Sequence, residues 1–165
     1  MLHTLRKRLE RDEDGFTLIE LMVVVLIIAI LLAIAIPTFL GARQRAQDRA
    51  AQSDIRNALT AEKTFYTDNQ VYTATTATLS GIEAALTYVA GNGTTAAVGV
   101  ALKAGTVAGD NNGICISKAS KSGANFSVLD VASGTNAGTY YYKASLSCSG
   151  EDGAAAPTVG VKTGW

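Results

Sequence analysis

The sequence contains one histidine, His3, in 165 residues. Histidine is the usual base of Ser–His and Cys–His catalytic pairs and a common ligand of zinc. A lone histidine near the N-terminus leaves no second imidazole from which such a site could be built. We therefore expect a protein that is not an enzyme, with no catalytic residue, no metal and no cofactor.

The chain also lacks an excess of charge of either sign, because 14 basic and 14 acidic residues cancel. Residues 1–15 carry four of each, so the rest of the chain is neutral as well. Avid binding of nucleic acid is typical of strongly basic proteins. Nucleic acid is a possible partner through a local basic patch, but the composition does not indicate it.

Polar side chains are absent from Leu21 to Ile36. The surrounding segment, residues 16–40, has 25 residues, enough to cross a ~30 Å hydrocarbon core as a helix. Glu20 is its only ionisable side chain. A charged side chain costs about 2.5–3.5 kcal/mol at the bilayer centre and less near an interface. Since lipid does not reward this charge, its presence indicates a functional role.

The charged residues 1–15 precede the apolar segment without forming an ordinary secretory signal. In such a signal a small-residue cleavage site follows the apolar core. Here the apolar run ends instead in Ile36-Pro37-Thr38-Phe39. The candidate cleavage site lies before the run, between Gly15 and Phe16. Cleavage there would remove residues 1–15 as a leader and leave the apolar helix on the mature protein.

The residues around this site occur in the order and spacing of one known family. They are Gly15, Phe16, Thr17, Leu18, Glu20 and Pro37. From about residue 14 to residue 65 the sequence resembles a type IV pilin precursor with a type III signal peptide. The resemblance implies that a membrane aspartic peptidase, the prepilin peptidase, cuts after Gly15 and methylates the amine of Phe16. It also implies a homopolymer, assembled by inner-membrane pilus machinery, that passes from the membrane into an extracellular filament.

Glu20 would then have a defined partner. Cleavage creates an ammonium group at Phe16, four residues before Glu20 and on the same helix face. In a filament the acid can pair instead with the new N-terminus of a neighbouring subunit. Such a pair offsets much of the cost of a charge in apolar surroundings and sets the register between subunits. The alternative is a carboxylate that is protonated, or reaches the lipid interface, and has no partner.

One long helix is predicted from residue 16 to about residue 66. Residues 16–40 are its apolar half, the membrane span and filament core, and residues 41–69 are its amphipathic half. The amphipathic half has an apolar stripe at three- and four-residue steps: Ala51, Ile55, Ala58, Leu59 and Phe65. Pro37 and Gly41 predict a kink or local melting between residues 33 and 41. By resemblance, this region can unwind in an assembled filament.

Residues 70–165 are predicted to form a globular head, which makes the fold class α+β. A capping-box pattern at Ser80–Glu83 predicts a short helix that reaches about Leu86. Strands are expected near residues 96–103, 113–118, 125–131 and 138–146, separated by segments rich in turn-forming residues. Short connections between successive strands imply an antiparallel meander with one face on the apolar stripe of the helix.

Cys115 and Cys148 are an even pair in a domain expected outside the membrane, where a disulfide is favoured. With 32 residues between the two cysteines, the bond would stabilise the fold by roughly 3–4 kcal/mol in the chain-entropy model. It resembles the disulfide-bounded C-terminal region of many pilins. Two free buried thiols are the alternative.

The favoured function is the structural subunit of a type IV pilus. A pseudopilin of type II secretion shares the leader, the acid and the proline, and is the first alternative. A single-span membrane-anchored extracellular binding module is an alternative from another class. Adhesion, twitching motility, DNA uptake and secretion use the same subunit plan, so the sequence does not distinguish them.

Overall fold

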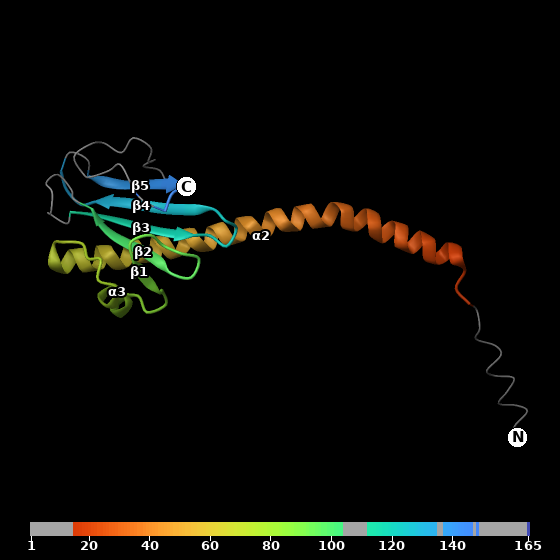
Figure 1. The fold of residues 1–165 in the computed structure, drawn as a ribbon, viewed down its shortest axis with the longest axis horizontal. Helices are drawn as coiled ribbons and strands as arrows, with labels where there is room; N and C mark the ends of the chain where they lie inside the picture. The colour runs from red at the N-terminus through yellow and green to blue at the C-terminus, as the bar shows by residue number, and fades with distance from the viewer. Residues whose placement is uncertain (1–14, 104–111, 135–136, 147, 149–164) are drawn as a thin grey trace, which may run out of the picture. The chain divides into compact units, whose positions relative to one another are not determined.

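The computed structural model describes residues 15–103, 112–134, 137–146, 148 and 165 (Figure 1). It confirms the α+β fold, with a long helix followed by a mostly antiparallel sheet. The chain divides into two compact units, residues 1–42 and 43–165, and the long helix contributes to both. The predicted leader, apart from Gly15, and most of the chain after Cys148 lie outside the described residues.

Helix α2 runs from Leu18 to Asn69, close to the predicted bounds. It ends where turn-forming residues begin. Gln70 has a φ of 58°, and its amide donates to the carbonyl oxygen of Tyr66 at 2.8 Å. A residue in this left-handed conformation closes the last turn and directs the chain away from the helix axis.

Pro37 and Gly41 lie inside α2 without interrupting it. Proline lacks the amide that would bond to the carbonyl four residues earlier. In the same turn, the hydroxyl of Thr38 donates to the carbonyl oxygens of Ile34 and Ala35 at 3.2 and 2.9 Å. The predicted kink at Pro37 and Gly41 stays a prediction, and the alternative, local melting, is absent from the isolated chain, in which α2 is continuous. The occurrence of this melting in a filament stays a prediction.

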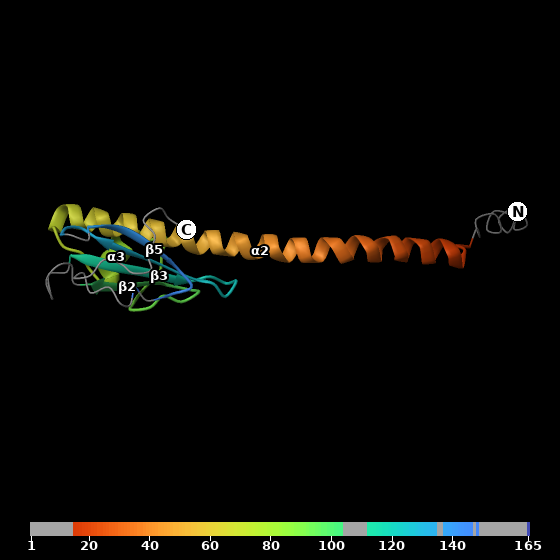
Figure 2. The same ribbon diagram turned by 90° about the horizontal axis from the view of Figure 1, so that it is seen from above.

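Five strands form one sheet in sequence order. They are β1 (Tyr88–Ala90), β2 (Val98–Lys103), β3 (Gly113–Ala119), β4 (Asn125–Val131) and β5 (Gly138–Lys143). The strands β2, β3, β4 and β5 pair antiparallel, each with the next, which confirms the predicted meander. Strand β1 was not predicted, and it pairs parallel with β2. Figures 1 and 2 show the sheet lying along the C-terminal part of α2.

The main core lies between α2 and one face of this sheet. Ile55 and Ala58 of the predicted stripe have 0% exposure, whereas Phe65 is only half-buried. The facing strand residues in the same cluster are Val100, Ile114, Ile116, Phe126 and Val128. Burying each large aliphatic or aromatic side chain contributes about 1.5–3 kcal/mol. This core holds the sheet on the second half of α2.

The opposite face of the sheet is covered as well. A second cluster contains Leu129, Tyr140 and Tyr142 together with the cysteines. Cys115 and Cys148 form the predicted disulfide, with their Cα atoms 5.9 Å apart. The sequence predicts that one face of residues 140–142 is core and the other exposed. Instead, Tyr141 packs against Trp165 beside the main core, while Tyr140 and Tyr142 are buried in the second cluster.

Helix α3 spans Thr76–Ile82, so the predicted helix from Ser80 to about Leu86 is wrong. Leu79, with 0% exposure, anchors this turn to the core. The amide of Glu83 bonds to the carbonyl oxygen of Leu79 at 2.8 Å and closes the helix. The Glu83 carboxylate accepts from the amide of Ala85 at 3.2 Å. The capping pattern at Ser80–Glu83 predicts the start of a helix, but Glu83 lies at the end of one.

The parallel connection from β1 to β2 depends on close backbone contacts at two glycines. A Cβ atom at Gly93 would lie 2.1 Å from the carbonyl oxygen of Ser117. A Cβ atom at Gly99 would lie 2.1 Å from the amide nitrogen of Gly93. The amide of Gly93 also donates to the Ser117 hydroxyl at 2.9 Å. Only glycine allows this loop to cross so tightly over β2 and β3.

Replacing Gly93 with alanine should destabilise the head by about 3 kcal/mol, because the new methyl group overlaps backbone that cannot move away. Gly81→Ala is the matched control, since a Cβ there meets nothing within 4 Å and alanine favours the helical state. Urea unfolding in mild detergent, followed by fluorescence of the single tryptophan, measures both. Equal stability of the two variants would contradict the tight crossing.

Candidate assembly site

The first turn of α2 is built around Thr17 and Glu20. Both the amide and the hydroxyl of Thr17 donate to Oε2 of Glu20, at 2.8 and 2.7 Å. The amide of Glu20 donates back to the Thr17 hydroxyl oxygen at 3.3 Å. Since α2 begins at Leu18, Thr17 is the N-cap and Glu20 the third helical residue. This reciprocal pair is a capping box.

The capping box gives the acid a local partner in the isolated chain. It satisfies backbone donors that a helix start otherwise leaves free, and the carboxylate lies at the positive end of the helix dipole. An ionised carboxylate has about four acceptor positions, so the bonds from Thr17 leave capacity for a further donor. Phe16, whose amine cleavage would expose, directly precedes the N-cap and has 87% exposure.

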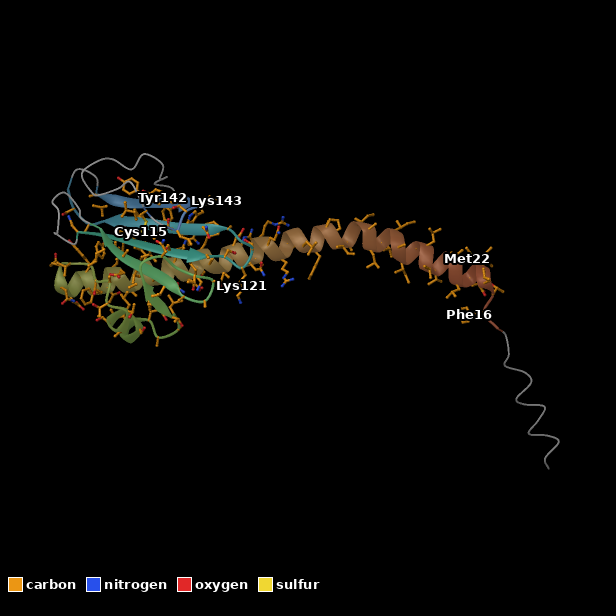
Figure 3. All side chains as sticks on the ribbon, in the orientation of Figure 1. Phe16, Met22, Cys115, Lys121, Tyr142 and Lys143 are labelled. Carbon is orange, nitrogen blue, oxygen red and sulfur yellow. A yellow bond between two sulfur atoms is a disulfide. The ribbon has the colours of Figure 1, made fainter. Side chains whose placement is uncertain are left out.

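The helix surface that follows is apolar and uncovered. Every residue from 15 to 40 is exposed, including Leu18 at 76% and Phe39 at 69%. Figure 3 shows side chains projecting from several sides of this part of α2, with Phe16 and Met22 labelled near its start. By length and composition, α2 is the one helix among the described residues that could cross a membrane. A continuous apolar surface of this kind marks an interface with lipid or with other proteins.

Comparison with known proteins identifies the motif at this site. Residues 11–36 match the family model of the prokaryotic N-terminal methylation motif. The chain therefore carries this N-terminal methylation motif at the start of its apolar run. The match includes Gly15, Phe16 and Glu20 and extends into the apolar run.

Relatives named as type IV pilins and as core proteins of type II secretion systems match part of the chain. The chain is 44% identical over 69 residues to the type IV wide pilus major component PilA4 of Thermus thermophilus, covering 42% of this chain and 53% of the relative. It is 47% identical over 58 residues to the type IV major pilin protein PilA of Myxococcus xanthus, covering 35% and 26%. It is 39% identical over 77 residues to the type II secretion system core protein G of Vibrio cholerae, covering 47% and 51%.

These alignments cover about half of the first relative and of the secretion protein, and a quarter of the Myxococcus pilin. The likeness therefore extends to part of this chain and to part of each relative.

The structure places the predicted site residues in three regions. Gly15 and Phe16 precede the N-cap of α2, and Glu20 lies in its first turn. Pro37 and Gly41 lie within the same helix, and the two cysteines are joined in the head. The capping box was missed, although Thr17-x-x-Glu20 is its sequence signature. The role in cleavage, methylation and register remains a prediction for these residues.

A buried acid in the head was also missed. Glu62, on α2, has 0% exposure. Its Oε2 accepts from the amide of Thr73 at 3.2 Å, and among the described residues its Oε1 has no partner. Burial raises the pKa of Glu62 to about 7, and the Thr73 amide opposes that shift only in part. The hydrogen bond from Thr73 thus attaches the segment that follows α2 to the side chain of Glu62.

A second buried carboxylate lies close by, on β4. Asp130 accepts a short hydrogen bond from the hydroxyl of Tyr72 and another from Thr139. Lys63 of α2 approaches it at 3.3 Å. Burial and the bond to Asp130 raise the pKa of Tyr72 far above its ordinary value. Unlike Glu62, Asp130 has a cation beside it and donors on both oxygens, so the two acids differ in how well they are satisfied.

Stability of the head should therefore fall as pH rises from about 4.5 to about 7. Over that interval folded Glu62 retains a proton that the unfolded chain releases, and above it the loss is complete. Glu62→Gln removes the charge but keeps an acceptor for Thr73. At pH 8 the variant should be about 2 kcal/mol more stable than the parent chain, and near pH 4.5 similar to it.

Urea unfolding in detergent at these two pH values, followed by tryptophan fluorescence, measures the difference. Asp68→Asn is the control, because Asp68 is an exposed acid on the same helix. If the stability of the parent chain changed between pH 4.5 and pH 8 by the same amount as that of the Glu62→Gln variant, the account would be contradicted.

Proposed function

We propose that this chain is the structural subunit of a bacterial type IV pilus, polymerising through the apolar half of α2 after loss of residues 1–15. One observation carries the proposal: the head covers the second half of the helix and leaves residues 15–40 exposed, with a capped acid at their start. Lipid would cover this surface before assembly. Other copies of the same helix would cover it afterwards.

The prepilin peptidase would cut between Gly15 and Phe16 and methylate the new amine. That ammonium is the donor for which Glu20 has spare acceptor positions. In a filament the amine of one subunit would meet the carboxylate of another, where the apolar surroundings strengthen the attraction. A misplaced subunit would leave one or both charges unpaired, which is expensive away from water. The pair therefore selects register as well as adding attraction.

Inner-membrane pilus machinery would extract the subunit and add it to the filament. The chain would thus move from the inner or cytoplasmic membrane to an extracellular fibre. Adhesion, twitching motility and DNA uptake are functions that such a fibre supports. The proposed role is structural and requires no catalytic residue.

A pseudopilin of type II secretion is the second candidate, because the core protein G of several bacteria also matches part of this chain. The Cys115–Cys148 bond favours the pilin, since it closes a C-terminal region as in many pilins. A membrane-anchored binding module would require that the leader stays and that no polymer forms.

Electron microscopy of filaments sheared from cells, with N-terminal mass analysis of their subunit, tests the proposal. The expected result is thin fibres whose subunit begins at methylated Phe16. A chain that keeps residues 1–15 and is found only as dispersed monomers would overturn it. If cells that lack this chain failed to secrete protein, and cells that have it carried no surface fibres, the pseudopilin would be favoured.

Glu20→Ala should abolish filaments, whereas Thr17→Ala should leave most of them. Both variants remove the capping box and cost about 1 kcal/mol at the helix start. Only the first also removes the carboxylate that would pair between subunits. The yield of sheared filaments measures the difference. Equal losses would show that Glu20 acts as a cap and not as an assembly contact.

A further inference from the structure

A groove in the second unit lies between α2, the β1–β2 loop and the β3–β4 turn. Its volume is about 700 Å³. Alanines form much of its lining, namely Ala46, Ala50, Ala51, Ala96 and Ala119. The charged side chains that line it are Arg43, Asp54, Lys118 and Lys121. The groove thus combines a small-residue, apolar floor with a predominantly basic rim.

Two of the three cations in the groove are free to meet an anion. Lys118 is paired with Asp54 at 3.0 Å. Arg43 and Lys121 are exposed, and neither makes an ion pair with any described residue. The turn that carries Lys121 is fixed to the helix, because the hydroxyl of Ser122 bonds to the carboxylate of Asp48. Figure 3 shows Lys121 beside α2 at this turn.

The groove begins immediately after the apolar run. Arg43 follows Leu40 by three residues on an unbroken helix, a rise of about 4.5 Å. When residues 16–40 span a bilayer, Arg43 therefore lies at headgroup depth. Basic residues next to a membrane span are attracted to anionic lipids by about 1 kcal/mol each. Here the fold adds a lysine from the head to the arginine on the helix.

We propose that this groove binds the phosphodiester headgroup of an anionic phospholipid in the membrane that holds the unassembled subunit. Arg43 and Lys121 contact the phosphate, and the alanine floor accepts the glycerol and the first methylenes. The proposal rests on the proposed function only in placing residues 16–40 in a membrane. A nucleic acid fits less well, because no aromatic side chain lines the groove to stack on a base.

The bound lipid would fix the head against the membrane surface before assembly, with Arg43 and Lys121 held at the headgroups. Extraction into a filament would then have to break this contact. The lipid composition of the membrane would in this way influence how readily a subunit is released to the growing fibre.

Native mass spectrometry of the full chain in mild detergent, titrated with phosphatidylglycerol or phosphatidylcholine, tests the site. The parent chain should bind phosphatidylglycerol about tenfold more tightly than phosphatidylcholine. Arg43→Gln with Lys121→Gln should lose that preference, and Arg43→Lys with Lys121→Arg should keep it. The matched control is Arg45→Gln with Lys143→Gln, which removes two exposed charges outside the groove and should keep most of the preference.

Equal losses in the two Gln pairs would overturn the proposal, because the attraction would then be diffuse. So would a parent chain without preference for phosphatidylglycerol. Groove-dependent binding of a 30-base-pair duplex in place of lipid would assign the surface to nucleic acid, and groove-dependent dimers would assign it to a second copy. The assay needs neither cleavage nor polymer, so a chain that binds the lipid but never forms fibres would refute the pilus role and not the lipid site.

Discussion

The unequal covering of one helix is the constraint on which the rest of the structure depends. The sheet packs on the second half of α2 through Ile55 and Ala58, and both faces of that sheet are buried. Residues 15–40, by contrast, are all exposed. The hydrophobic effect that folds the head therefore leaves a second apolar surface unburied, and this surface requires lipid or further copies of the chain.

The acid at the start of that surface has a local partner in the isolated chain and, on the proposed function, would gain a second partner in a filament. In the isolated chain Glu20 closes a capping box with Thr17. This arrangement lowers the cost of keeping a carboxylate next to an apolar segment, because the charge accepts two short hydrogen bonds. In a filament the same group would gain an ammonium partner. A local cap and an intersubunit contact are compatible, since a carboxylate accepts several donors.

Sequence periodicity predicted the elements that are long and regularly patterned. Helix α2 and strands β2 to β5 fall close to their predicted places because apolar residues recur with the spacing of each element. Strand β1 has three residues, too few for a detectable alternation, and its parallel pairing depends on backbone contacts of Gly93 and Gly99. The disulfide followed from cysteine number and compartment, whereas its packing against Tyr140 and Tyr142 required the fold.

The capping-box pattern occurs at two places in the sequence, and its outcome was predicted correctly at neither. Ser80–Glu83 has the capping-box pattern but ends a helix, because burial of Leu79 decides where α3 lies. Thr17–Glu20 has the pattern and forms the box. Glu62 escaped prediction because a search for an apolar stripe passes over an acid at a buried position. Tertiary packing, which the local sequence does not contain, decided the place of α3 and the burial of Glu62, whereas the box at Thr17 and Glu20 is a local feature that its sequence signature predicts.

The central claim is that residues 16–40 are never exposed to water in the cell, although the head leaves them uncovered. Single cysteines at Leu26 and Ile34, compared with one at the exposed Thr67 near the end of α2, test it most directly, since the described residues contain no free cysteine. Membrane-impermeant maleimide should label only the third position, in membranes and in sheared filaments alike. Labelling of all three positions at similar rates would contradict the account.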